Sequence, residues 1–300
     1  MTILVAGSAA HEDLILDADR QPSSSEVATL AINPGSKGIW LPGGAARTIS
    51  LAARMQGADV RLWYPQPVTD RAIALLEEMG VDISQTPVQD IDAVRCLLVY
   101  GNEGRLAWST RLLSVAPAYI ERLLEGVTHT VISPVWGPWA DILVEACDKR
   151  DIPVSLIGDA SPQARAYKWH TVILDAEQFS AIGDIKCETA VVTDGERGAT
   201  VRRNGALTKI EAVKVRVVDT TGAGDTFGGS FLACRLLGQG IADAGNIAAK
   251  IAARACEGWG SWAAFEKRSK LNCQTIFSIG LKAHCWQQPV VTRLVCQTRF

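Results

Sequence analysis

Residues 217–233, VVDTTGAGDTFGGSFLA, combine a strand end, a glycine turn and a helix start in one stretch. The apolar run ends at Asp219, and Gly222 and Gly224 let the chain turn sharply before an apolar helix. The unpaired amides and the dipole of a helix start both favour negative charge. The stretch therefore predicts an anion site, suited to a phosphoryl group, at the amides of Gly222, Ala223 and Gly224.

Asp225 lies in the first turn of that predicted helix. A carboxylate there can take the proton of an attacking hydroxyl, a contribution of roughly 10²- to 10⁴-fold in rate. The rest of a phosphoryl transfer would come from positioning and charge stabilisation. The alternative is that Asp225 only complements the helix dipole, worth about 0.3 to 1 kcal/mol, and that the glycines form an ordinary tight connection.

Strand and helix patterns alternate along the rest of the chain. The apolar run at 3–7 predicts a buried first strand, 42–57 predicts a helix, and the alternation continues from 128 to 255. This order is expected of an α/β protein with a doubly wound, mostly parallel central sheet and helices on both faces. Short strand patterns around 14–41 and 95–109 predict a small β lid.

Composition excludes several classes of partner. The 30 basic and 32 acidic residues nearly balance, which gives no electrostatic reason to expect nucleic acid or an anionic membrane. The eight cysteines are scattered without metal-site spacing, which favours a reduced, cytoplasmic protein. No run reaches the roughly 18 apolar residues that span a bilayer, so we expect a soluble protein that is not exported.

The string DTTGAGDTF at 219–227 closely resembles the signature of the ribokinase-like, or PfkB, carbohydrate kinases. The resemblance implies a ribokinase-like fold and an ATP-dependent transfer to a hydroxyl of a sugar or nucleoside. It makes Asp225 the catalytic base and gives Gly222, Ala223 and Gly224 the role of an anion hole. It also implies that Asp219 helps to hold a monovalent cation such as K⁺; a plain strand-end or cap role for Asp219 stays equally open.

The N-terminal half carries a weaker resemblance, on the acceptor side. LPGGAARTISLAARMQG at 41–57, preceded by NPGS, is similar to the pseudouridine-kinase or nucleoside-kinase branch, where a Gly-Gly pair opens a helix at the sugar site. Here the pair is Gly43 and Gly44, and Thr48 stands where relatives have Asn, as a substrate contact or as a packing residue. An acidic residue that binds acceptor hydroxyls matches Asp13 by the strand that follows, or Glu12 by spacing.

The nucleotide side is matched by VVTDGERGATV at 191–201, which resembles the family's T-x-G-x-x-G segment along ATP. That resemblance gives Thr193, Gly195 and Gly198 nucleotide contacts, although an ordinary hairpin also uses such glycines. Asn246 and Gly260 would flank the adenine.

The segment TVILDAEQF at 171–179 departs from the family pattern. Relatives have Asn-x-x-Glu there, a motif that orders magnesium-bound water. Asp175 and Gln178 replace those residues, and Glu177 is adjacent. Magnesium is still expected to neutralise the ATP phosphates, with several waters and few protein ligands.

The resemblance covers residues 1–265, which we expect to form one kinase domain with a lid from 14–41 and 95–109. Residues 266–300 lack a sustained period and predict an appended tail of doubtful structure. Exposed lid edges could pair two subunits as a homodimer, which is an expectation by analogy with relatives.

Two other functions compete with the kinase. A ligand-binding or regulatory pseudokinase is suggested by Thr48, Gln178 and the tail, and is opposed by the intact Gly-Ala-Gly-Asp. A nicotinamide-dependent dehydrogenase is disfavoured because GSAAHEDL after the first strand lacks G-x-G-x-x-G. No Walker motif occurs, so a P-loop does not hold the phosphates. The acceptor itself is not identified by the sequence.

Overall fold

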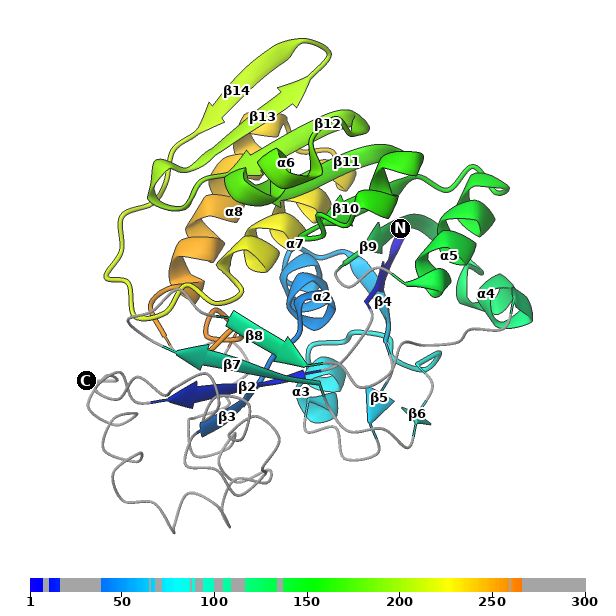
Figure 1. The fold of residues 1–300 in the computed structure, drawn as a ribbon, viewed down its shortest axis with the longest axis horizontal. Helices are drawn as coiled ribbons and strands as arrows, with labels where there is room; N and C mark the ends of the chain where they lie inside the picture. Colours follow the sequence, from blue (N-terminus) through cyan, green and yellow to red (C-terminus); the bar gives the residue numbers. More distant parts are fainter. Residues whose placement is uncertain are drawn as a thin grey trace.

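Figure 1 shows the computed structural model of the chain. It describes residues 1–7, 11–16, 39–64, 66–67, 72–86, 88–89, 94–99, 105–108, 117–133, 137–258 and 260–265. The predicted tail at 266–300 and parts of both predicted lid ranges lie outside these residues.

The main sheet has eight strands. In spatial order they are β14 (Ala206–Ile210), β13 (Ala199–Arg203), β12 (Lys186–Thr193), β11 (Lys168–Asp175), β10 (Val154–Ile157), β9 (Val127–Ile132), β1 (Thr2–Ala6) and β4 (Asp59–Trp63). The pairs from β4 to β12 are parallel, and β13 and β14 add an antiparallel hairpin at one edge. Within the sheet, β4 lies on one side of β1, and β9, the next strand of this sheet along the chain, lies on the other side of β1. The carboxyl ends beside β1 are therefore the switch point where such sheets bind ligands.

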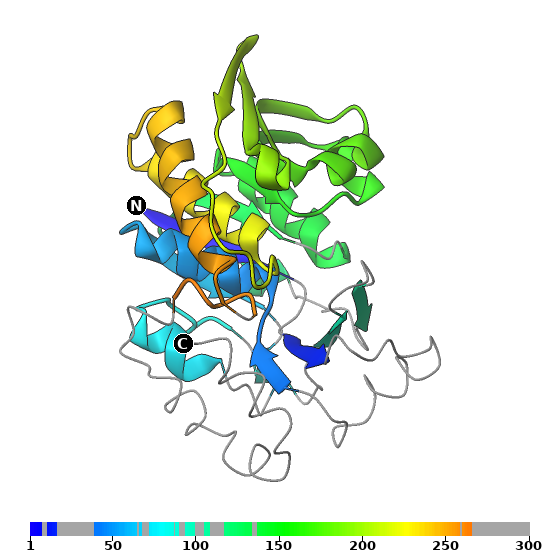
Figure 2. The same cartoon turned by 90° about the vertical axis from the view of Figure 1, so that its left-hand side faces the viewer.

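Helices cover both faces of this sheet (Figure 2). One face packs against α2 (Ala45–Met55), α3 (Ile73–Glu78), α7 (Ala223–Leu236) and α8 (Ile241–Ala255). The other packs against α4 (Pro117–Leu123), α5 (Pro138–Asp148) and α6 (Ala176–Ile182). Alternate residues of β1 divide between the two cores, with Ile3 and Val5 in one and Leu4 and Ala6 in the other. Apolar side chains on both faces are what a strand of a buried parallel sheet requires. The predicted fold class is confirmed.

Two glycines allow α7 to lie unusually close to its neighbours. A Cβ at Gly228 would be 2.8 Å from Ile157 Cγ2 on the sheet, and one at Gly229 would be 2.4 Å from the carbonyl oxygen of Ile49 on α2. Because a real Cβ does not approach so closely, this pair of glycines fixes the contact of α7 with both the sheet and α2. The position of the loop before α7 follows from that contact.

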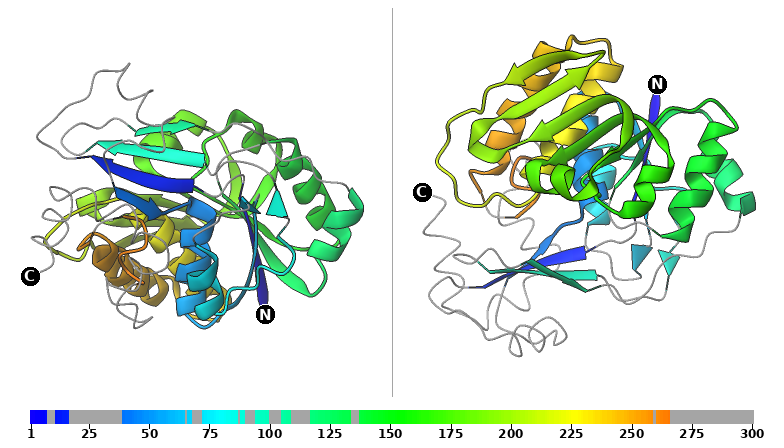
Figure 3. Two further views of the ribbon diagram at one scale, coloured as in Figure 1. Left: turned by 90° about the horizontal axis from the view of Figure 1, so that it is seen from below. Right: turned by 45° about the horizontal axis from the view of Figure 1, so that its top comes forward.

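A smaller sheet with the order β3-β2-β7-β8 lies apart from the main one (Figures 1 and 3). Its strands are β2 (His11–Leu16), β3 (Ile39–Pro42), β7 (Val94–Val99) and β8 (Arg105–Trp108), and β3 leads directly into α2. A short parallel pair, β5 (Gln66–Pro67) and β6 (Val88–Gln89), completes the strands of the described residues. That the small sheet acts as a lid stays a prediction. Within the described ranges, the helices are all too short or too polar to cross a bilayer.

Candidate active site

The loop before α7 is fastened by the carboxylate of Asp219, whose side chain is buried. Its Oδ1 accepts a hydrogen bond from the amide of Thr221 at 2.8 Å, and its Oδ2 accepts one from the amide of Gly260 at 2.8 Å. The pKa of the nearby Cys256 thiol is raised by burial and, after that, by the negative charge of Asp219. One carboxylate therefore closes its own turn and holds a second segment, 260–265, against the loop.

Gly222 is the residue at which this loop becomes a helix. Its φ of 72° lies in the left-handed region, and a Cβ there would be 2.5 Å from Ser261 Cβ. Its carbonyl oxygen accepts the amide of Thr226 at 2.8 Å, which starts the hydrogen bonding of α7. Glycine is required here for two reasons, the backbone angle and the packing against Ser261.

Gly224 and Asp225 occupy the first turn of α7. Gly224 is exposed, and a Cβ added there would have no neighbour within 4 Å in the part of the chain that the structure describes. Asp225 is half-buried. The first turn of a helix offers its own amides no acceptor, so this open side of the turn is chemically suited to a negatively charged group.

The start of α7 is level with the carboxyl ends of the central strands. Gly228 packs on Ile157 and Ile173. Burial, and to a smaller extent the positive charge of Arg235, lower the pKa of His170, so the later part of α7 lies toward the earlier part of β11. Helix and strand therefore run in opposite directions. Gly224, one turn before Gly228, extends past the last residue of β10 toward the carboxyl edge of the sheet.

A buried carboxylate lies just past the end of β10. β10 ends at Ile157, which pairs with Ile173, and Asp159 follows the turn at Gly158, whose φ is 72°. Asp175 pairs with Thr193 at the ends of the next two strands, β11 and β12. The Asp159 side chain is 4% exposed. Its Oδ1 accepts the amide of Ser161 at 2.7 Å, and its Oδ2 has no hydrogen-bond partner within the described residues. Sequence patterns did not single out Asp159, although an Asp just after an apolar strand and a glycine was the available signal.

The altered Asn-x-x-Glu segment forms a helix cap. Asp175 accepts the amide of Gln178 at 2.7 Å, and Gln178 Oε1 accepts the amide of Asp175 at 3.1 Å. Gln178 Nε2 also donates to the carbonyl oxygen of Gly158 at 3.1 Å, which ties α6 to the end of β10. Glu177 is exposed in the first turn of α6. Across the described ranges, no three His, Cys, Asp or Glu side chains gather as a metal cluster.

The predicted nucleotide segment is a turn between β12 and β13. Thr193 ends β12, and its hydroxyl donates to the carbonyl oxygen of Leu174 at 3.4 Å. Gly195 has a φ of 51°, and a Cβ added there would meet no atom of the described residues within 4 Å. Gly198 has a φ of 86°, and a Cβ there would be 2.0 Å from the carbonyl oxygen of Ile210. Packing of the hairpin therefore accounts for Gly198, whereas no contact in the described part of the chain accounts for Gly195.

The two remaining nucleotide candidates differ in their surroundings. Asn246 is exposed on α8. Gly260 is buried, with a φ of 78°, and its amide is the group that Asp219 holds. The structure thus brings Gly260 to the loop before α7 but, among the described residues, shows no contact that joins Asn246 to it.

On the acceptor side, Gly43 and Gly44 precede α2. Gly44 caps that helix with a φ of 106°, and its carbonyl oxygen accepts the amide of Thr48 at 2.9 Å. Thr48 is fully buried, as a packing residue would be, and its hydroxyl has no partner within the described residues. Asp13 lies in β2, paired with Leu41 and Cys96 in the small sheet.

Comparison with known proteins shows which family part of the chain resembles. Residues 170–267 match the model of the pfkB family carbohydrate kinases. An uncharacterised sugar kinase of Archaeoglobus fulgidus is 34% identical over 74 residues, which is 25% of this chain and 30% of that protein. A ribokinase of Bacillus subtilis is 22% identical over 291 residues, covering 90% of this chain and 97% of the relative. The stronger local match therefore spans less than a third of the archaeal relative.

Solved structures share the fold at low sequence identity. A putative ribokinase II from E. coli, in complex with ATP and Mg²⁺, has a TM-score of 0.72 at 17% identity and covers 94% of this chain and 99% of its own. A nucleoside kinase of Burkholderia thailandensis, in complex with inosine, has a TM-score of 0.69 at 16% identity, with coverages of 93% and 98%. Residues 170–267 are thus similar in sequence to the pfkB family carbohydrate kinases, and the fold of the chain is that of the solved ribokinase-like structures.

Proposed function

We propose that the protein is an ATP-dependent kinase that transfers the γ-phosphoryl group to a hydroxyl of a small sugar or nucleoside. The observation that carries this proposal is the glycine-lined start of α7, where Asp225 sits in the first turn beside the open face of Gly224. The matched relatives include sugar kinases, and a nucleoside kinase shares the fold.

In the proposed reaction, Asp225 takes the proton of the acceptor hydroxyl as its oxygen bonds to the γ-phosphorus. The bond from that phosphorus to the bridging oxygen breaks, and ADP leaves. The amides at Gly222 to Asp225 would lie around the charge on the transferred group, where fixed dipoles are most effective. The amide of Ala223 also donates to the carbonyl oxygen of Thr220 at 3.2 Å, so it would share its proton with that group. Gly43 and Gly44 would leave room for the acceptor, and Asp13 would bind its hydroxyls.

The proposed nucleotide lies along the turn that contains Thr193 and Gly195, with Gly198, Asn246 and Gly260 around it. Magnesium would supply charge neutralisation of the ATP phosphates. The buried Oδ2 of Asp159, which has no hydrogen-bond partner among the residues that the structure describes, fits such a cation, because Mg²⁺ takes one or two carboxylates and keeps several waters. Glu177 is a second candidate ligand. Both oxygens of Asp219 already accept backbone amides, so a K⁺ beside that loop would use their remaining lone pairs.

We also propose a cellular compartment and an oligomeric state for the protein. Cys147, Cys187, Cys234 and Cys256 are free thiols, which fits a reducing, cytoplasmic compartment. A homodimer through the small sheet is also proposed, by analogy with relatives.

Asp225→Asn tests the base, with Asp243→Asn as a matched control. Both residues are the acidic member of the first turn of a helix whose N-cap is glycine, α7 in one case and α8 in the other. ADP release is first measured for the wild-type protein over a panel of sugars and nucleosides. We expect Asp225→Asn to lower kcat at least 10³-fold with unchanged unfolding midpoint, and Asp243→Asn to keep wild-type turnover. Full turnover by Asp225→Asn would remove Asp225 from the reaction.

A ligand-binding protein without turnover is the second candidate. It is favoured by Gln178, because both polar atoms of its side chain are engaged in structural hydrogen bonds. The same panel separates the two functions, since a pseudokinase would show ligand-induced thermal stabilisation without ADP release.

A further inference from the structure

Arg47 is a charged side chain buried in the first turn of α2, only 2% exposed. Its guanidinium carbon lies 5.7 Å from the ring centroid of Tyr64 and 5.6 Å from that of Trp262. A planar guanidinium can stack on aromatic faces in a way that a lysine ammonium cannot. Two rings therefore fix where this buried cation sits.

The two rings belong to different parts of the chain. Tyr64 directly follows β4 and is fully buried. Trp262, which is 4% exposed, belongs to the segment 260–265 that Asp219 holds through the amide of Gly260. Its neighbour Ser261 packs directly on Gly222. A continuous set of contacts thus runs from Arg47 through Trp262 and Ser261 to the start of α7.

We propose that Arg47 is a positioning residue that sets the start of α2 against the start of α7. Each of these helices begins at a glycine with positive φ, Gly44 at 106° and Gly222 at 72°. Such flexible residues do not by themselves hold the two helix starts at a fixed separation. Farther along the helices, α7 packs directly on α2 at Gly229 and Ile49. The contact of Arg47 with Trp262 adds a connection at the two helix starts themselves.

The consequence for catalysis rests on the proposed kinase function. Gly43 and Gly44 would be on the acceptor side, and Gly224 and Asp225 on the phosphoryl side. Arg47 need not touch either reactant, because a shift of about 1 Å between two reacting groups can cost about 10²-fold in rate. Loss of Arg47 should therefore lower kcat while leaving KM for ATP within about threefold of the wild-type value.

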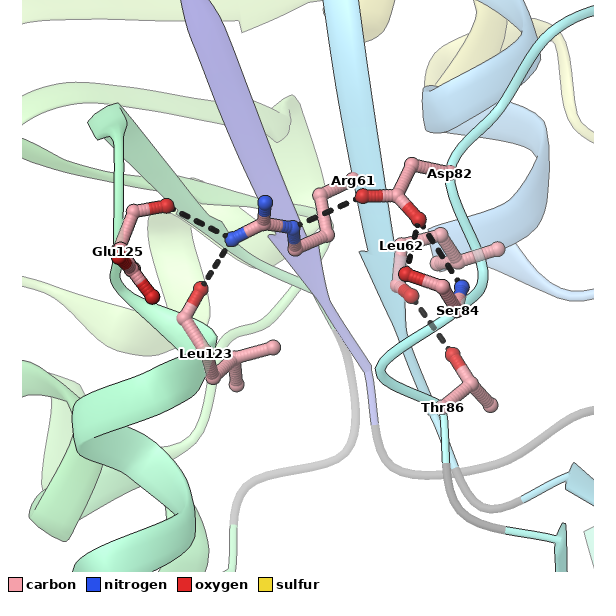
Figure 4. Close-up of polar contacts among 7 residues, drawn as sticks. All are labelled: Arg61, Leu62, Asp82, Ser84, Thr86, Leu123 and Glu125. Carbon is pink, nitrogen blue, oxygen red and sulfur yellow. Dashed lines mark hydrogen bonds and ion pairs between the residues drawn. The ribbon is translucent and has the colours of Figure 1, made fainter.

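Arg61 provides a matched control (Figure 4). It is another partly buried arginine that ties chain segments together, through Asp82 Oδ2 at 3.0 Å and the carbonyl oxygens of Leu123 and Glu125 at 2.8 and 2.9 Å. The Asp82 carboxylate in turn accepts the hydroxyl and the amide of Ser84. These contacts join β4 to α4 and to residues 82–84, none of which belongs to the loop before α7.

Hydrogen–deuterium exchange of the amides in 221–226 tests the connection without any substrate. The amides of Thr221, Ala223 and Thr226 are hydrogen-bonded there, so their protection reports on the loop. We expect Arg47→Met and Trp262→Leu to speed exchange at least tenfold in 221–226, Trp262→Phe to stay near wild type, and Arg61→Met to leave 221–226 unchanged. Unchanged protection in Trp262→Leu, or equal acceleration in Arg61→Met, would overturn the proposal.

Kinetics then separate a positioning role from general destabilisation. We expect Arg47→Met and Arg47→Lys to lower kcat about 10- to 100-fold, whereas Trp262→Phe should keep most of the wild-type kcat. In the double variant Arg47→Met/Trp262→Leu, the loss of kcat should differ clearly from the product of the losses in the two single variants. If Arg47→Met does not fold, the difference in exchange rate between Trp262→Leu and Trp262→Phe still tests the proposed connection. If the wild-type protein releases no ADP with any acceptor, the kinase function fails, and the exchange data still decide the role of Arg47.

Discussion

Asp219 and Gly260 are joined by a hydrogen bond of 2.8 Å, although 41 positions of sequence separate them. The bond brings the segment after α8 onto the loop before α7. Because Ser261 then packs on Gly222, the shape of the proposed anion site depends on a residue that lies outside the glycine motif itself.

Asp219→Asn should destabilise the protein, because one carboxylate oxygen that accepts a backbone amide becomes a donor. Hydrogen bonds to charged groups contribute about 1.5 to 3 kcal/mol, so we expect the free energy of unfolding to fall by about 2 kcal/mol. Urea denaturation measures this change. The control is Asp194→Asn, which removes an exposed ion pair with Arg197 and should lower the free energy of unfolding much less than Asp219→Asn does. Equal effects of the two substitutions would contradict the structural role of Asp219.

Alanine at Gly224 and at Gly222 should act in opposite ways on stability. Gly224 is helical and open, so Gly224→Ala should raise the free energy of unfolding by up to about 1 kcal/mol. Gly222→Ala should lower it by about 2 kcal/mol or more, because its φ is 72° and Ser261 fills the space.

Measuring the activity of Gly224→Ala tests the proposed functional role of Gly224. If a phosphoryl group sits against the open face of the first turn, Gly224→Ala should lower kcat/KM at least tenfold in a protein that is no less stable. Turnover by Gly224→Ala at the wild-type rate would show that no ligand approaches that turn.

Alanine substitutions at Gly195 and Gly198 test whether each glycine is needed for nucleotide binding or for packing of the hairpin. Gly198→Ala should destabilise by about 3 kcal/mol or more, since its Cβ would collide with the Ile210 carbonyl oxygen. Gly195→Ala has space and should cost only about 1 to 2 kcal/mol for the left-handed backbone. If ATP lies along this turn, Gly195→Ala should raise KM for ATP about fivefold and leave KM for the acceptor unchanged. A change in the acceptor KM alone would place the nucleotide elsewhere.

His129 should make stability depend on pH. Burial, and then the nearby His170, lower its pKa from 6.5 to about 3, and its Nε2 lies 2.9 Å from Ser155 Oγ. Because the folded value lies below the unfolded one, the unfolded chain binds the proton more readily. The stability that the folded protein gains from keeping His129 neutral is therefore complete above about pH 6.5. As the pH falls from there toward 3, the free energy of unfolding decreases by up to about 1.4 kcal/mol per pH unit.

His129→Gln checks this dependence by urea denaturation at pH 7 and pH 5. Removing the titrating group should make the loss of stability between these two pH values smaller by about 2 kcal/mol than in the wild-type protein. An identical loss in both proteins would mean that His129 is protonated in the folded state or is not buried.

The sequence alone determined the alternation of strands and helices, and hence the parallel sheet, because periodicity and glycine positions are local properties of the chain. It also pointed to the proposed anion site, since a strand end, a glycine turn and a helix start are adjacent in 217–233. The open face of Gly224 and the left-handed backbone of Gly222 agree with that interpretation.

Only the tertiary structure decided which residues from distant segments meet. Gln178 at the start of α6 donates to the carbonyl oxygen of Gly158, the residue before Asp159, and no local pattern encodes that contact. The same holds for the role of Arg47, which becomes informative only because Tyr64 and Trp262 lie on either side of its guanidinium. Contacts between segments far apart in the chain depend on packing of the whole core, so residue types and spacing alone could not reveal them.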